Sequence, residues 1–276
     1  MRCIVRDPAR AGELERLGCE IRRGDVTDEQ SLRGAGEQMD VAYFLVHAMA
    51  GGAGFQARER EGAANFARMA KREGVARVVY LGGLGDESVS EHLRSRHETA
   101  MALAEHGPPL TYFRAAMVVG ARSESYRTIR HLVSRLPVMI APSWLRKATQ
   151  PIGIDDVVEY LRRAPDVPES EGREVQIGGP DVLSYADMLD RMALAMGKRP
   201  RPKLPVPFIT PWLSALWIGL VTPVDTNVAR PLVEGLTTET VVSDASAAAS
   251  FGISAAPFDE TLRRALAEER RMAPGG

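Results

Sequence analysis

Two continuous apolar runs, separated by one amphipathic helix, constrain the fold more than any other feature of the sequence. Residues 41–46 (VAYFLV) and 78–81 (VVYL) show no alternation of polar and apolar side chains, which is typical of strands covered on both faces. Between them, apolar residues recur at helical spacing over residues 55–70, with arginines and glutamates on the opposite side. The pattern predicts a β-α-β unit in a parallel sheet.

The same alternation continues along the first two thirds of the chain. We expect further strands at residues 3–5, 19–21, 110–113 and 174–177, and helices at 91–105, 126–136, 155–163, 184–196 and 258–271. Asp7 before Pro8 is a cap signal for another helix, up to Gly18. The sequence therefore predicts an α/β fold, with a doubly wound parallel sheet over residues 1–200 and a small C-terminal lobe packed on it over residues 201–276.

Composition narrows the classes of partner and compartment. The net charge of −1 provides no global field for nucleic acid, so we expect no nucleic-acid partner. The only cysteines are Cys3 and Cys19, which favours a reducing, cytoplasmic setting in which both are small strand residues rather than a structural disulfide. Met1 leads straight into the first strand, without the apolar region of a signal peptide.

One stretch requires a membrane test. Residues 204–224 carry no charge and include Trp212 and Trp217, but four prolines leave only residues 212–222 uninterrupted. A spanning helix needs about 20 apolar residues. We therefore expect no membrane span and a buried or interfacial helix here, with peripheral membrane contact as the alternative.

Several short segments, in order, resemble those of a known family. They are VRDP at 5–8, GDVTD at 24–28, YFLVH at 43–47, VYLGGLG at 79–85, HLRSR at 92–96, FRAAMVVG at 113–120, QPI at 150–152, DDV at 155–157 and GGP at 178–180. The chain resembles the atypical short-chain dehydrogenase/reductases: NmrA-like and bacterial NAD(P)H-binding proteins and, more distantly, the nucleotide-binding accessory subunit of respiratory complex I. The resemblance implies a Rossmann-type sheet that binds a dinucleotide beyond the carboxyl ends of its strands.

The resemblance places the adenosine half of the cofactor on three residues. Arg6 ends the strand whose tip faces the adenosine ribose, and a guanidinium there suits a 2′-phosphate, so NADP(H) is expected in preference to NAD(H). An acidic residue at this strand end would bind the ribose 2′-hydroxyl of NAD(H), so the adjacent Asp7 mildly favours NAD(H). Its role as a helix cap, however, explains Asp7 without a ligand. Asp25 and Val26 match the pair that holds the adenine edge; the alternative is that Asp25 only shapes a turn.

Further residues fall on the rest of the expected cofactor site. Leu45, Val46 and His47 close the strand that lines the ribose and phosphates in this family. His47 either donates to a phosphate or is a histidine satisfied at a strand end. Gly82 and Gly83 end the next strand, where the family places a hydroxyl-bearing residue.

The family's first strand and glycine-rich turn, which bind the pyrophosphate, have no counterpart in the chain. The opening residues already match the second strand, and residues 51–54 (GGAG) follow the fourth strand and cannot substitute. Without a central strand, those at Cys3 and Phe44 should lie two spacings apart, about 9–10 Å. We therefore predict that the sequence is a truncated or late-started reading of a longer protein.

The family's catalytic tyrosine and lysine are also replaced. In register, His92 stands at the tyrosine position and Arg96 at the lysine position. Arg96 keeps a positive charge for the nicotinamide ribose. His92 either transfers a proton, since an ordinary histidine pKa is about 6.5, or is an exposed histidine at the start of a helix.

Three functions follow. The first is an NAD(P)(H)-binding protein with a sensing, regulatory or assembly role. The second is an oxidoreductase or isomerase with non-standard acid/base residues, whose hydrophobic substrate, quinone- or isoprenoid-like, lies between residues 113–117 and Trp212 and Trp217. The third is a membrane-associated accessory protein.

Overall fold

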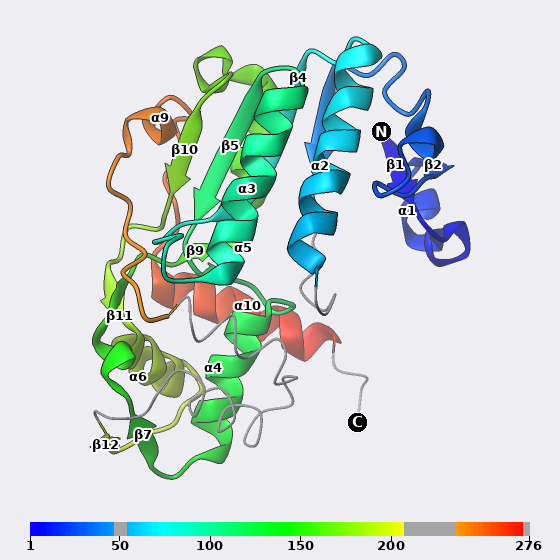
Figure 1. Cartoon of the computed structure of the whole chain (residues 1–276). Helices are drawn as coiled ribbons and strands as arrows, with labels where there is room; N and C mark the ends of the chain where they lie inside the picture. Colours follow the sequence, from blue (N-terminus) through cyan, green and yellow to red (C-terminus); the bar gives the residue numbers. More distant parts are fainter. Residues whose placement is uncertain (47–53, 207–235, 273–276) are drawn as a thin grey trace. The chain divides into compact units, whose positions relative to one another are not determined.

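The computed structural model describes residues 1–46, 54–206 and 236–272 (Figure 1). His47, Trp212 and Trp217 lie outside these residues. The strands are β1 (Arg2–Val5), β2 (Glu20–Arg23), β3 (Val41–Phe44), β4 (Arg77–Gly83), β5 (Leu110–Ala115), β6 (Val118–Val119), β7 (Met139–Ala141), β8 (Ala148–Thr149), β9 (Ile152–Gly153), β10 (Glu174–Ile177), β11 (Leu183–Ser184) and β12 (Lys203–Pro205).

The longer helices are those that the apolar periodicity predicts. They are α2 (Phe55–Arg72), α3 (Glu91–His106), α4 (Glu124–Arg135), α5 (Ile154–Arg163), α6 (Tyr185–Ala195) and α10 (Phe258–Met272). The short helices are α1 (Gly12–Arg16) and α9 (Ser246–Ala249), with 3-10 turns η1 (Pro8–Arg10), η2 (Glu29–Leu32), η3 (Ser143–Arg146), η4 (Ala164–Asp166) and η5 (Pro168–Ser170).

The predicted α/β class with a parallel sheet is confirmed. Four strands form a sheet in the order β10-β5-β4-β3, and β3 and β4 run parallel, with Phe44 opposite Tyr80. The helix α2 connects β3 to β4, as the two apolar runs predict. The first strand, β1, also lies in a parallel pair, but with β2, where Val5 is opposite Arg23.

The strand pair β1–β2 and the four-stranded sheet are not joined to each other by any described strand. In the described part of the chain, β1 pairs with β2 alone, and β3 pairs on one side alone, with β4 (Figure 1). The backbone N–H and C=O groups on the free edges of β1 and β3 therefore have no ladder partners among the described strands.

The chain divides into two compact units, each with its own core. One unit comprises Met1–Gly82, Ser95–Tyr112 and Pro165–Glu174. Its core joins η2, β3, α2, β4 and α3, and includes the buried Phe44, Phe66 and Tyr80. The rings of Phe44 and Phe66 have centroids 5.2 Å apart. This unit contains most of the predicted cofactor residues.

The other unit comprises Gly83–Arg94, Phe113–Ala164 and Val175–Gly276. Its core is formed by α4, α6 and α10, with Tyr126, Met188 and Leu262 fully buried. Short strand pairs, β6 with β9, β7 with β12 and β8 with β11, lie around these helices. The predicted domain boundary near residue 200 remains a prediction.

The segment after β1 departs from the predicted single helix. Asp7 caps as expected, accepting from the Ala9 N–H at 3.1 Å, but the turn that follows is the 3-10 turn η1, and α1 begins only at Gly12. Cys3 and Cys19, on either side of this segment, are free thiols. Burial and a hydrogen bond to Cys19 raise the pKa of the Cys3 thiol.

Candidate functional site

The turn after β2 is built around Asp25. The main-chain N–H and the hydroxyl of Thr27 both donate to Oδ1 of Asp25, at 2.9 and 2.8 Å. The N–H of Asp25 in turn donates to Oγ of Ser31 at 2.9 Å. Asp28 caps η2 by accepting from the Gln30 N–H at 3.0 Å. These local hydrogen bonds hold the turn in one conformation.

Asp25 is kept ionised by its surroundings. The two hydrogen bonds from Thr27, together with the nearby charge of Arg6, hold the pKa of Asp25 below its usual value. Arg6 follows β1 directly and is exposed. Since β1 and β2 are parallel, Arg6 and Asp25 lie just beyond the carboxyl ends of neighbouring strands. The structure thus brings these two predicted residues together.

Val26 is held by α2 on two sides. Nδ2 of Asn65 donates to the main-chain oxygen of Val26 at 2.9 Å. A Cβ atom on Gly62 would lie 2.9 Å from Cγ2 of Val26, so this close approach requires a glycine. Asn65 is only 4% exposed. The sequence interpretation missed both residues of α2; an asparagine among the buried alanines of an apolar helix face is the signal that could have identified Asn65.

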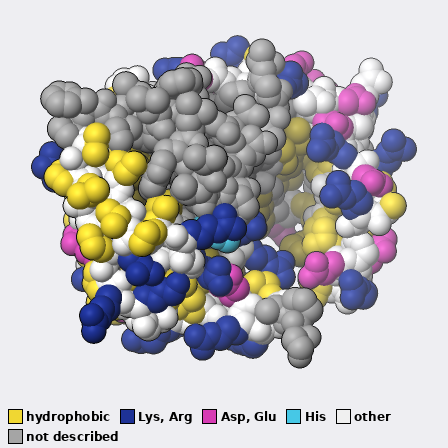
Figure 2. Space-filling view, turned by 90° about the horizontal axis from the view of Figure 1, so that it is seen from below, with side chains coloured by type: hydrophobic (Ala, Val, Ile, Leu, Met, Phe, Trp, Pro, Cys, Tyr) yellow, Lys and Arg dark blue, Asp and Glu magenta, His cyan; other side chains and the backbone are white. Residues whose placement is uncertain are grey.

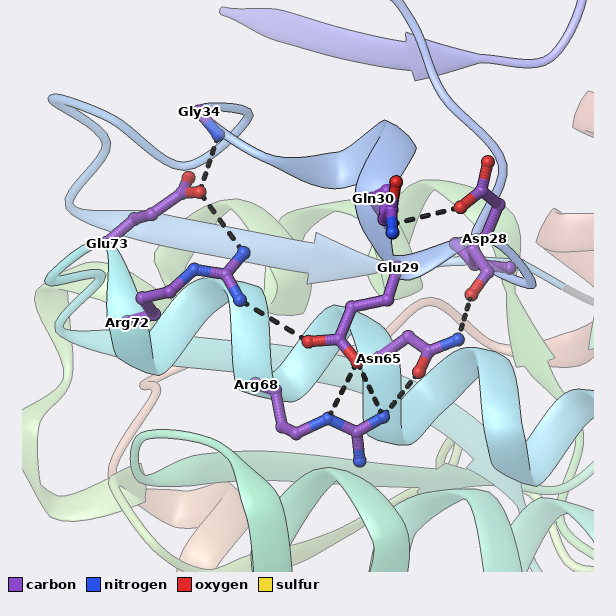
Figure 3. Close-up of polar contacts among 9 residues, drawn as sticks. Asp28, Glu29, Gln30, Gly34, Asn65, Arg68, Arg72 and Glu73 are labelled. Atoms are coloured by element: carbon purple, nitrogen blue, oxygen red, sulfur yellow. Dashed lines mark hydrogen bonds and ion pairs between the residues drawn. The ribbon is translucent and has the colours of Figure 1, made fainter.

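A chain of polar contacts continues from Asn65 along α2 (Figure 3). Arg68 donates to the side-chain oxygen of Asn65 and to Oε2 of Glu29, from Nε at 3.2 Å and from Nη2 at 3.1 Å. Arg72 reaches the other oxygen of Glu29 at 3.4 Å. Because Glu29 opens η2, these pairs fix the segment after Asp25 and Val26 to α2.

Glu73, just after α2, anchors the far end of the same segment. Its carboxylate accepts from the main-chain N–H groups of Gly34 and Gly36, each at 2.6 Å. Gly34 has a φ of 75°, in the left-handed region that favours glycine. The side chain of Glu73 is 9% exposed. A charged acceptor for these two N–H groups thus fixes the path from η2 to β3.

The ends of β3 and β4 lie level with each other. Phe44 is opposite Tyr80, so Leu45 and Val46 follow at the height of Leu81 and Gly82. Leu45 is 50% exposed and Val46 is 46% exposed, which leaves apolar surface beyond the end of β3.

The glycines that end β4 are covered by side chains. A Cβ atom on Gly82 would lie 2.8 Å from the ring of Tyr112, and one on Gly83 would lie 2.5 Å from Leu93. Arg114 donates to the carbonyl of Gly83 at 3.1 Å and forms an ion pair with Glu87 at 2.8 Å. The contacts made by Arg114 fix the turn after β4, another feature that the sequence interpretation missed.

The helix α3 carries the two predicted catalytic residues. His92 and Arg96 are four residues apart, one turn of the helix, so their side chains lie on one face. His92 is half-buried, and Arg96 is 7% exposed. Burial raises the pKa of the neighbouring Tyr80, and the charge of Arg96 opposes this rise. Arg96 is thus a largely buried cation beside a phenol.

The first part of the sequence, just under half of the chain, matches a known protein family. Residues 1–129 match the model of a family described as NAD(P)H-binding. The matched residues are of the NAD(P)H-binding type. This match supports the resemblance to the atypical short-chain dehydrogenase/reductases. None of the curated proteins matches the chain in sequence.

Solved structures extend the similarity of fold beyond the matched residues. The structure of triphenylmethane reductase from Citrobacter sp., complexed with NADP(H), has a TM-score of 0.75 at 15% identity, over 96% of this chain and 90% of that chain. The NADPH-dependent quinone oxidoreductase QOR2 of Escherichia coli, complexed with NADPH, has a TM-score of 0.71 at 17% identity, over 95% of this chain and 88% of that one.

A third similar structure contains the other cofactor. The Bordetella bronchiseptica enzyme WbmH in complex with NAD+ has a TM-score of 0.66 at 18% identity, over 93% of this chain and 84% of that one. Structures of this fold therefore occur with either dinucleotide. In the described part of the chain, no helix is long and apolar enough to cross a membrane. The same residues contain no group of three His, Cys, Asp or Glu side chains that could hold a metal ion.

Proposed function

We propose that Arg6, Asp25 and Val26 bind the adenosine half of NADP(H). The observation that carries the proposal is the strand register, which places Arg6 and Asp25 just beyond the carboxyl ends of the neighbouring parallel strands β1 and β2. An ionised carboxylate accepts from the exocyclic amine of adenine, and an exposed guanidinium binds a 2′-phosphate through parallel donors. The residues present therefore fit this half of the cofactor.

The remaining predicted residues would hold the other half. Leu45 and Val46 present apolar surface beyond β3, and His47 follows them in the sequence. Gly82 and Gly83 supply backbone without side chains at the end of β4. Arg96 would place a positive charge near the nicotinamide ribose. When bound, the reduced nicotinamide supplies a hydride.

The test of cofactor preference is a titration of the protein with NADPH and NADH, followed by cofactor fluorescence. Arg6→Ala should weaken NADPH binding at least tenfold and leave NADH binding nearly unchanged. Arg10→Ala, also an exposed arginine beyond β1, is the matched control and should change neither. If Arg6→Ala weakened both cofactors equally, Arg6 would not contact a 2′-phosphate.

For the biological role, we propose that cofactor occupancy is sensed, in a regulatory or assembly function, because Arg96 and His92 replace the usual lysine and tyrosine. The free thiols Cys3 and Cys19 suit a reducing cytoplasm. The second candidate is an oxidoreductase or isomerase for a hydrophobic, quinone- or isoprenoid-like substrate. It is favoured by the fold shared with a quinone oxidoreductase and by the position of His92, one turn from Arg96.

The two roles differ in turnover. The protein is incubated with NADPH and a panel of quinones and carbonyl compounds, and the absorbance of NADPH is followed. Tight binding without loss of absorbance supports the sensing role. Turnover that falls in His92→Ala, but not in His106→Ala at the other end of α3, supports the oxidoreductase or isomerase function. His92 would then be the residue that transfers the proton.

A further inference from the structure

The strand pair β7–β12 brings together two segments that are strongly basic. Residues 125–147 and 191–206 each contain five lysines or arginines and no aspartate or glutamate, in a chain of net charge −1. Met139 lies opposite Lys203 in the parallel pair. Nζ of Lys198 also donates to the carbonyl of Ser134 at 3.5 Å, near the end of α4. The fold therefore concentrates positive charge that the sequence distributes over two distant segments.

Some of this charge is neutralised by nearby acids. Arg127 pairs with Glu124 at 2.9 Å, Arg130 with Glu269 at 2.7 Å, and Lys203 with Asp190 at 2.5 Å. Arg191 lies 3.6 Å from Asp181 and 3.5 Å from Asp259. By contrast, Arg146, Lys147 and Arg199 are exposed, and no described residue forms an ion pair with them.

The outer side of the same strand pair is apolar. Met139 is buried in the core, so its neighbours Val138 and Ile140 point to the opposite side of β7. Leu204 is paired with Ile140 and is 59% exposed, and Val138 is 41% exposed. Figure 2 views the molecule from the side on which β7 and β12 lie in Figure 1, and there hydrophobic side chains gather beside lysines and arginines.

We propose that this surface, the β7–β12 face, binds the surface of an anionic phospholipid membrane. We define the face by Val138, Ile140 and Leu204 together with Arg146, Lys147 and Arg199. Basic side chains are attracted to anionic headgroups, and aliphatic side chains among them enter the boundary between headgroups and acyl chains. A nucleic acid would use the cations but would leave the aliphatic side chains exposed to water.

The sequence beyond β12 agrees with a lipid partner. The uncharged stretch that contains Trp212 and Trp217 begins at Leu204, within the β7–β12 face, although residues 207 and beyond lie outside the described part. No described helix could cross a membrane, so the proposal is adsorption to the surface. It is independent of the proposed cofactor function, because none of the proposed cofactor residues belongs to the face.

The test is flotation of the whole chain with vesicles of phosphatidylcholine alone and of phosphatidylcholine with phosphatidylglycerol. We expect binding to the anionic vesicles only, weakened by salt. Removal of one basic residue near the surface should lower partitioning about fivefold, and a reversal of charge should lower it more. Arg199→Glu and Lys147→Glu should therefore release the protein, while Arg10→Glu, the same change outside the face, should not.

Leu204→Ser tests the apolar part of the face. This variant should bind anionic vesicles of the same composition more weakly than wild type, while the effect of salt on binding stays unchanged. Circular dichroism and the thermal midpoint show whether each variant is folded. Equal binding to neutral vesicles, or binding that Arg10→Glu and Arg199→Glu lower equally, would overturn the proposal. The absence of vesicle binding would also overturn the proposal. If the same protein then bound duplex DNA or RNA through Arg199 and Lys147, the face would be a nucleic-acid surface instead.

Discussion

The side-chain amide of Asn65 donates to the main-chain oxygen of Val26 across 39 residues of sequence, at 2.9 Å. Its own oxygen accepts from Arg68, which also pairs with Glu29. Asn65 therefore connects the residue proposed to pack on adenine with the helix that follows β3.

Asn65→Ala should destabilise the fold and weaken cofactor binding. The Val26 carbonyl would lose its donor in a largely buried setting, which costs about 1–3 kcal/mol in the free energy of unfolding. Chemical denaturation measures this loss, and NADPH titration measures the change in binding. Gln30→Ala, an exposed side chain in the same turn, is the control and should change either quantity little. An unchanged free energy of unfolding in Asn65→Ala would contradict the role assigned to its amide.

Gly62→Ala should disturb Val26 directly. The new methyl group would lie 2.9 Å from Cγ2 of Val26, so the turn must move away from α2. We expect NADPH binding to weaken, although alanine favours a helix over glycine by about 1 kcal/mol. Gly12→Ala in α1 is the matched control, because no atom lies within 4 Å of its added Cβ. That variant should gain stability and leave binding unchanged.

Glu73→Gln removes the negative charge that accepts from Gly34 and Gly36. Hydrogen bonds to charged groups contribute about 1.5–3 kcal/mol each, and an amide oxygen can replace one of the two. We expect a loss of roughly 1–3 kcal/mol in the free energy of unfolding. Glu61→Gln, an exposed residue earlier in α2, should be close to neutral. Equal stability of the two variants would show that the two N–H groups do not depend on Glu73.

The N-terminus of α6 should depend on pH through Asp187. Ser184 and Asp187 form a capping box, and the Ser184 hydroxyl is the main cause that holds the pKa of Asp187 below its usual value. A depressed pKa in the folded state gives a contribution that is complete above the unfolded pKa, about 3.9, and is lost as the pH falls through the folded pKa.

Ser184→Ala should therefore lower stability by about 1 kcal/mol at pH 7, with a smaller difference from wild type at pH 3. Thermal unfolding at the two pH values measures the effect. Ser246→Ala in α9, where no side-chain cap bond forms at the preceding residue, is the comparison. If the stability difference between wild type and Ser184→Ala were larger at pH 3 than at pH 7, the hydroxyl of Ser184 would not be what lowers the pKa of Asp187.

The sequence by itself determined the local elements and their order. The apolar runs at β3 and β4, the amphipathic helix α2 between them and the cap at Asp7 all depend on residues a few positions apart. Their periodicity and chemistry can therefore be read along the chain.

Only the tertiary structure decided which distant residues meet. Asn65 with Val26, Glu73 with Gly34, and β7 with β12 are separated by long stretches of sequence, and no local pattern encodes those contacts. The burial of Arg96 is of the same kind, because it depends on the packing of α3 within the fold. Propensity and capping act within a turn or two of the chain, whereas burial and long-range hydrogen bonds exist only after the elements have packed.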